Sequence, residues 1–112
     1  MRLYDLYLGR AVAGRADVSD TEWREFRDQV VTPALPDGYT VFDAQGAWMN
    51  TKSRTTIVEA TKVLSVALPN TPESLAAIAR IRGTWQSRFH QYVAGMTVHD
   101  VCASFAPGDA SK

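Results

Sequence analysis

The chain has 112 residues, of which 46 % are apolar and 21 % are charged, and twelve basic residues balance twelve acidic ones. This length suits one domain with its own core, and this composition excludes a wholly disordered chain. Because a chain without net charge has no general attraction for phosphate backbones, we expect no nucleic-acid partner. The single cysteine excludes an internal disulfide.

The sequence predicts a cytoplasmic protein with no membrane partner. The opening residues MRLYDLYLGR lack the long apolar segment of a signal peptide. No apolar run approaches the roughly 20 residues that a membrane-spanning helix needs.

The first third of the chain predicts a strand and a helix. Residues 3–8 are apolar and aromatic apart from one aspartate, which is typical of a strand. Ser19 and Glu22 have the spacing of a capping box, which begins a helix. Apolar side chains at 23, 26 and 30 give that helix one buried stripe, and Pro33 and Pro36 are expected to end it.

The middle of the chain predicts a hairpin. An extended run over 39–49 contains Gly46, a candidate β-bulge. A strand rich in valine, threonine, isoleucine and leucine follows over 55–68, and the polar residues 50–54 form the loop between them.

A second helix and a last strand complete the pattern. Thr71 and Pro72 begin an amphipathic helix that runs to about Gln91, with Gly95 as a stop signal, and residues 97–105 form the last strand. The order of elements is βαββαβ. This order predicts an α+β ferredoxin-like domain with a four-stranded antiparallel sheet and two helices on one face.

The domain is expected to span residues 1–106, with 107–112 as a flexible C-terminal tail. Ferredoxin-like sheets often cover their other face with a second copy, so by analogy with that fold we expect a homodimer that forms a dimeric α/β barrel. Apolar residues expected on that open face would otherwise form a large exposed patch. They are Val41, Ile57, Val63, Val101 and Phe105.

Strand side chains alternate between two faces, so residue parity predicts which of them share a face. The even positions, among them Phe42 and Trp48, have the character of the face beneath the helices, although a bulge at Gly46 would reverse Trp48. The odd positions gather polar side chains on the open face. These are Asp5, Tyr7, Asp43, Gln45, Glu59, Thr61 and His99.

Several blocks of residues carry a family resemblance. They are Leu6–Gly9, Val30–Pro33 with Asp37–Gly38, Thr40–Trp48, Glu59–Val63 and the stretch from Trp85 to Val93, and together they span nearly the whole chain. These blocks resemble the bacterial domain-of-unknown-function family 3574, whose members are small ferredoxin-like proteins. The chain departs from that pattern at Thr61, where serine is usual, and at Met49, where a basic residue is usual. The resemblance implies a ferredoxin-like fold and implies no particular reaction.

Glu59 is the leading candidate for catalysis, because a carboxylate in mid-strand between apolar neighbours is unusual unless it is paired or functional. Burial would raise the pKa of Glu59 and make it usable as a general acid or base. The alternative is a structural salt bridge to Lys62 or to an arginine. Asp43 and Tyr7 are the other catalytic candidates, Asp43 to orient the substrate or Glu59 and Tyr7 to donate its phenol to a developing oxyanion.

A wider set of residues is expected to bind substrate: Gln45, Trp48, Arg10, Thr61, Lys62, His99, Arg88 and Gln91. Trp48 would offer a flat apolar wall, and Arg10 would clamp a carboxylate. Their structural alternatives are core packing for Trp48, a solvated loop for Arg10 and capping of a helix C-terminus for Arg88. We expect no metal and no other cofactor, because the two histidines lack a third ligand at metal-site spacing and no glycine-rich phosphate loop is present.

These features favour a small cofactor-independent enzyme. A carboxylate would act as general acid or base on a small, largely apolar substrate, aromatic or polyketide-like, in a cavity on the sheet face. The reaction would be of the lyase, isomerase, cyclase or hydrolase type. The alternative is a non-catalytic dimeric module that binds a small molecule or another protein.

Overall fold

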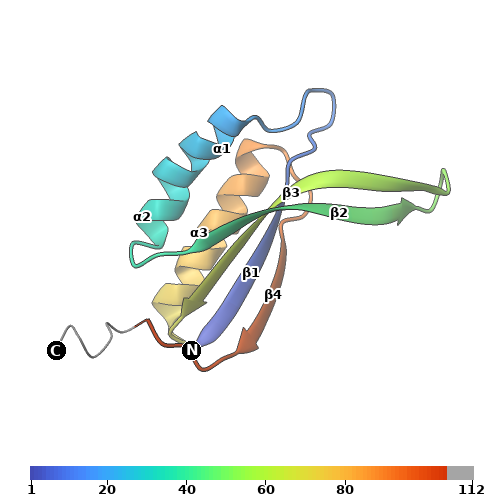
Figure 1. The fold of residues 1–112 in the computed structure, drawn as a ribbon. Coiled ribbons are helices and arrows are strands. Elements are labelled where there is room, and N and C mark those ends of the chain that lie inside the picture. Colours follow the sequence, from blue (N-terminus) through green and yellow to red (C-terminus); the bar gives the residue numbers. More distant parts are fainter. Residues whose placement is uncertain (106–112) are drawn as a thin grey trace.

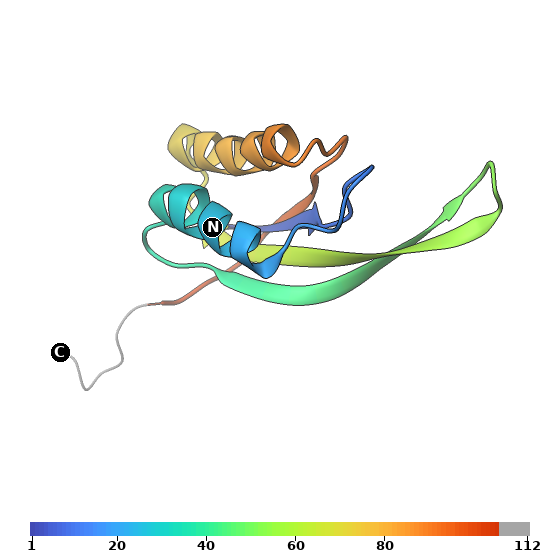
Figure 2. The same ribbon diagram turned by 90° about the horizontal axis from the view of Figure 1, so that it is seen from above.

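The computed structural model describes residues 1–105, so the predicted tail over 107–112 lies outside the described residues. Four strands form one antiparallel sheet in the order β2-β3-β1-β4. The strands are β1 (Arg2–Gly9), β2 (Thr40–Asn50), β3 (Thr55–Leu68) and β4 (Gly95–Asp100). Two helices, one built from three consecutive segments, cover one face of this sheet (Figure 2). The chain therefore has an α+β fold.

The first helix begins as predicted and ends between the two prolines that were expected to end it. The side chain of Ser19 accepts a hydrogen bond from the backbone N–H of Glu22 at 3.1 Å, and the Glu22 carboxylate accepts one from the Ser19 N–H at 3.0 Å. The helix continues without a break through α1 (Asp20–Phe26), the π-helical turn η1 (Arg27–Val31) and α2 (Thr32–Ala34). Pro33 lies within the last helical segment, and the helix ends at Ala34, two residues before Pro36.

The second helix, α3 (Pro72–Arg88), also begins as predicted, with the Thr71 side chain accepting a hydrogen bond from the N–H of Ser74 at 3.2 Å. It ends three residues before the predicted end, because His90 adopts a left-handed backbone conformation with φ of 52°. Gly95 is not the stop: it opens β4, which ends at Asp100 rather than at 105.

The core lies between the helices and the sheet. Trp85 of α3 packs its ring edge-on against Phe26, with centroids 4.9 Å apart, and its ring nitrogen donates to the carbonyl of Gly9 at 3.2 Å. This bond fixes the end of β1 against the helix layer. On the sheet, the buried apolar side chains are even residues of β1 and β3, as parity predicted: Tyr4, Leu6, Leu8, Leu64 and Val66.

Beyond the end of β1, the hairpin of β2 and β3 continues alone. The ladder between β1 and β3 begins at Thr61, so residues 45–60 form a two-stranded ribbon, here called the arm. The arm extends past the helices (Figure 1). Pairing runs without a bulge through Gly46, which lies opposite Glu59. The side chains of Trp48, Met49 and Val58 in the arm are all more than half exposed.

Parity assigns the faces of β1 and β3 correctly and those of β2 wrongly. Val41 lies opposite Leu64 and packs against the core, whereas Phe42 lies opposite Val63 and is 54 % exposed. Every residue of β2 thus has the face opposite to the predicted one. Trp48 points to the open face, and Asp43 and Gln45 point to the helix side.

No helix in the described part of the chain is long and apolar enough to cross a membrane.

Candidate functional site

A hollow of about 530 Å³ lies on the open face of the sheet, where β1 ends, β4 begins and the arm departs. Its lining comes from all four strands and from the loop after α3. The lining residues are Tyr7, Gly9, Trp48, Glu59, Thr61, Gln91, Tyr92, Val93 and Gly95. The structure therefore gathers five of the predicted site residues: Tyr7, Trp48, Glu59, Thr61 and Gln91.

Glu59 lies on the floor of this hollow and is half-buried. Its Oε1 accepts a hydrogen bond from the N–H of Ala11 at 3.4 Å, and its carboxylate lies directly against the α-carbon of Gly9. A Cβ atom at Gly9 would overlap Oε1 and lie 2.9 Å from Cδ of Glu59. The absence of a side chain at Gly9 is therefore what lets the carboxylate occupy this position.

The predicted alternative for Glu59, a salt bridge to Lys62, is wrong. Glu59 and Lys62 are an odd number of residues apart in one strand, so their side chains leave opposite faces of the sheet. Lys62 is buried on the helix side, where its Nζ lies 2.5 Å from Oδ1 of Asp43 and 5.4 Å from the centre of the Trp23 ring. Within residues 1–105, no basic side chain lies within ion-pair distance of Glu59.

Asp43 and Gln45 were predicted to share the open face with Glu59, and the structure places them on the other side. Lys62 lowers the pKa of Asp43 below its usual range, chiefly through the hydrogen bond and also through its charge. Asp43 and Lys62 are thus a structural pair, and neither they nor Gln45 line the hollow.

Tyr7 and Thr61 present hydroxyl groups on the hollow side of the sheet. The hydroxyl of Tyr7 shares a hydrogen bond with that of Thr97 at 3.2 Å, and the Tyr7 side chain is 40 % exposed. Thr61 is buried, and its hydroxyl donates to the carbonyl of Glu59 at 3.4 Å. Tyr7 can therefore reach a ligand directly, whereas Thr61 supports the strand that carries Glu59.

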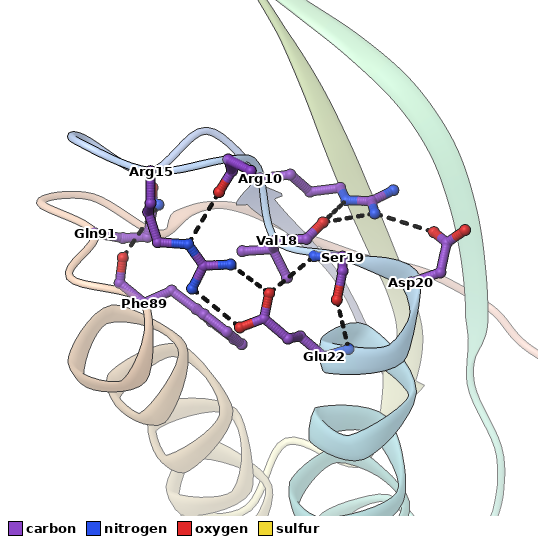
Figure 3. A network of polar contacts seen from close by, with 9 residues as sticks. Arg10, Arg15, Val18, Ser19, Asp20, Glu22, Phe89 and Gln91 are labelled. Carbon is purple, nitrogen blue, oxygen red and sulfur yellow. Dashed lines mark hydrogen bonds and ion pairs between the residues drawn. The ribbon is translucent and has the colours of Figure 1, made fainter.

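Arg10 does not line the hollow, because the loop before α1 engages it (Figure 3). Its guanidinium donates to the carbonyl of Val18 at 2.6 and 2.9 Å and bonds Oδ1 of Asp20 at 3.0 Å. Gln91, in the same figure, closes the other side of this loop: its Nε2 donates to the carbonyl of Ala11 at 2.6 Å. Arg10 and Gln91 together fix the loop whose Ala11 N–H bonds Glu59.

Arg88 and His99 also lie outside the hollow lining. Arg88 joins α3 to η1, because its Nη1 donates to Oε1 of Gln29 at 3.3 Å and its guanidinium lies 5.6 Å from the centre of the Phe26 ring. His99 is exposed on the open face opposite Leu3, at the other end of β4 from Gly95.

Four lining residues were not among the predicted site residues: Gly9, Tyr92, Val93 and Gly95. Gly9, Tyr92 and Val93 each lie in a block that carries the family resemblance, which is the signal that could have identified them. In the described part of the chain, no three histidine, cysteine, aspartate or glutamate side chains are grouped to hold a metal ion.

The family described as "Protein of unknown function (DUF3574)" matches residues 3–105. This chain belongs to the DUF3574 family. The match covers every block on which the sequence resemblance was based. No curated protein matches this DUF3574 chain.

Among solved structures, the DUF3574 chain is similar to a phage SAM lyase in complex with S-methyl-5'-thioadenosine. The TM-score is 0.64 at 8 % sequence identity, and the match covers 88 % of this chain and 80 % of the lyase chain. At this identity the likeness extends to the fold alone.

Proposed function

We propose that this DUF3574 protein is a cofactor-independent enzyme in which Glu59 acts as general acid or base on a small, largely apolar substrate. The observation that carries the proposal is the setting of Glu59. Its carboxylate is half-buried in a hollow with aromatic walls, and within residues 1–105 it has no ion-pair partner. A carboxylate held in a concave site without a charged partner is suited to exchange a proton with a ligand.

The neighbours of Glu59 supply the other functions that such a site needs. Tyr7 offers an exposed phenol that can donate to developing negative charge, and Trp48 offers a flat apolar wall. Asp43 and Gln45, on the far side of the sheet, have no part in this proposal.

The reaction belongs to the lyase, isomerase, cyclase or hydrolase type, and the lyase type is the first to test. The phage SAM lyase shares the fold, and the ligand in its complex supports the choice of the first probes, SAM and S-methyl-5'-thioadenosine. The wider panel contains small aromatic, lactone and organic-acid compounds.

The test compares the wild-type chain with Glu59→Gln, and uses Glu25→Gln as a matched control, because Glu25 is exposed on α1, far from the hollow. Thermal shift finds the ligands, and proton NMR of the incubated mixture finds turnover. We expect Glu59→Gln to abolish turnover with an unchanged circular dichroism spectrum, and Glu25→Gln to retain it. Full turnover by Glu59→Gln contradicts the proposal.

We also propose that the domain is ferredoxin-like and forms a homodimer through its open face, so that a dimeric barrel encloses the hollow. The strand order β2-β3-β1-β4 supports the first part. Exposed apolar side chains on that face, Phe42 and Tyr7 among them, support the second. Sedimentation equilibrium should give twice the mass of the chain, and Phe42→Ser should give the monomer. A wild-type monomer at all soluble concentrations contradicts the dimer.

A non-catalytic module is the second candidate, and the arm is the observation that favours it. Met49 and Val58 are exposed on the face of the arm that lies away from the hollow. If this candidate is right, the chain binds ligands without converting them. It also forms an assembly that Met49→Ser disrupts and Glu59→Gln does not.

A further inference from the structure

Two glycines line the hollow, and a third lies on β2 opposite its carboxylate. Gly9 of β1 and Gly95 of β4 line it, and Gly46 of β2 lies directly opposite Glu59. A Cβ atom at Gly95 would lie 3.5 Å from the side chain of Tyr7, and one at Gly46 would lie 3.6 Å from the hydroxyl of Thr61. The missing side chains leave a depression between flanking larger ones.

The lining combines aromatic rings with one negatively charged side chain. Tyr7, Trp48 and Tyr92 supply the rings, and Glu59 is the only charged residue among those that line the hollow in the described part of the chain. Trp48 is 54 % exposed and Tyr92 is 97 % exposed, so their ring faces are available to a ligand. A ligand that complements this lining would have an apolar surface to contact the rings and a positive charge to pair with the carboxylate.

The basic residues that follow two of the lining residues in the chain are engaged elsewhere. Arg10 is bonded to Val18 and Asp20, and Lys62 is paired with Asp43 on the helix side. The chain as a whole carries no net charge, so any preference of the hollow for a cation comes from the lining itself. The positive charge that complements Glu59 is therefore left for a ligand to supply.

We infer that the hollow binds an organic cation, a quaternary ammonium or sulfonium group on an apolar body. Such groups are weakly hydrated and lie favourably against the faces of tryptophan and tyrosine rings, and a carboxylate adds direct charge attraction. One carboxylate offers too few oxygen ligands for a hard metal ion such as Ca²⁺. This inference rests on the proposed function, because it names the class of substrate that Glu59 meets.

The test uses two molecules of one shape that differ in charge: choline and its neutral isostere 3,3-dimethylbutan-1-ol. Each is titrated into ¹⁵N-labelled full-length protein, and the amide signals of Gly9 and Gly95 report occupancy of the hollow. We expect choline to bind at least about tenfold more tightly than the isostere. Glu59→Gln and Trp48→Ala should each reduce that ratio several-fold, whereas Glu25→Gln should leave it unchanged.

The outcomes separate the inference from the proposed function. Equal affinity for the two molecules, or choline shifts that avoid the glycine signals, overturns the cation inference. A charge ratio that survives in Glu59→Gln overturns it as well. Cation binding without turnover of any compound in the panel supports the inference and contradicts the enzyme. Glu59-dependent turnover of a neutral compound, with no preference for choline, supports the enzyme and overturns the cation inference.

Discussion

The contact between Gly9 and Glu59 gives the sharpest test of how the Glu59 carboxylate is positioned in the hollow. The three atoms nearest to a Cβ at Gly9 all belong to Glu59, and the third of them is 3.5 Å away, so nothing else crowds the position. Gly9 is not among the described residues with a positive φ, so an alanine there meets no backbone strain. Within the folded chain, the substitution Gly9→Ala therefore acts through Glu59 alone.

The size of the effect follows from the geometry. Cδ of Glu59 must move from 2.9 Å to an ordinary separation of about 3.5–4.0 Å, a shift of about 1 Å. The move breaks the long hydrogen bond to Ala11 and disturbs local packing, at a cost of about 1–2 kcal/mol. The lower backbone freedom of alanine in the unfolded chain returns about 0.4–1 kcal/mol. Gly9→Ala should therefore destabilise the wild-type chain by about 1 kcal/mol.

The same substitution should have the opposite sign once Glu59 is removed. In the Glu59→Ala background nothing obstructs the new methyl group, so Gly9→Ala should stabilise the chain by about 0.4–1 kcal/mol. The four chains form a double-mutant cycle with a coupling free energy of about 1.5 kcal/mol. Urea unfolding, followed by the fluorescence of the buried Trp23 and Trp85, measures each free energy of unfolding. Effects of Gly9→Ala that agree in the two backgrounds within about 0.5 kcal/mol would refute the reasoning.

Three further predictions concern the helices and the core. The hydroxyl of Tyr4 is buried and has no hydrogen-bond partner within residues 1–105, so Tyr4→Phe should keep or raise the urea-derived stability by up to about 1 kcal/mol; a clear loss would reveal a partner. Gly83 lies inside α3, and a Cβ there meets nothing within 4 Å, so Gly83→Ala should add about 1 kcal/mol and raise the melting temperature by about 4 °C. The hydrogen bond from Arg15, and next that from the Ser19 backbone, lower the pKa of Glu22 from 4.5 to about 2. Because a depressed acid pKa gives stability above the unfolded pKa that is lost as pH falls, the melting-temperature gap between wild type and Glu22→Gln should close between pH 4.5 and 2; a gap that widens on acidification contradicts this.

Local rules account for the parts of the fold that the sequence predicts well. The capping pair Ser19 and Glu22 and the N-cap Thr71 are each read from neighbours within one helical turn, and all are present. Residues 55–68 match β3 at both ends because loop residues bound them. Such signals do not depend on distant parts of the chain.

The face of β2 could not be read so easily, because it depends on the length of one turn. A five-residue loop over 50–54 would place Met49 opposite Thr55, and residues of equal parity would then share a face. The turn instead has four residues, so Asn50 lies opposite Thr55, and every pair joins an odd residue with an even one. One residue of turn length therefore decides whether Asp43 or Trp48 joins Glu59.

The loop after the second helix, which completes the hollow, could not be predicted because the helix pattern continues to Gln91. Continuing the helix to Gln91 places that residue on a helix, whereas the left-handed conformation of His90 releases Gln91, Tyr92 and Val93 into a loop. A positive φ at a residue other than glycine has little sequence signal, because only a few per cent of such residues adopt it, although histidine is enriched among them. That Tyr92 belongs to a loop lining the hollow, and not to a helix, therefore appears only in three dimensions.

The backbone hydrogen bonds of the arm and those of the core are expected to open independently of each other. Its ladder bonds join only β2 to β3, and at its base the Ala60 carbonyl also accepts a hydrogen bond from the Arg10 N–H at 2.9 Å. A two-stranded ribbon by itself is marginal in water, so the ladder bonds beyond that base can open while the core stays closed. Amide hydrogens over residues 45–60 should thus exchange with deuterium through local opening, at rates insensitive to substitutions in the core. Any molecule that settles on Trp48, whether a ligand or another copy of the chain, slows that exchange. The rate of amide exchange in the arm therefore reports whether a molecule is bound at Trp48, and its measurement requires no assay for a reaction.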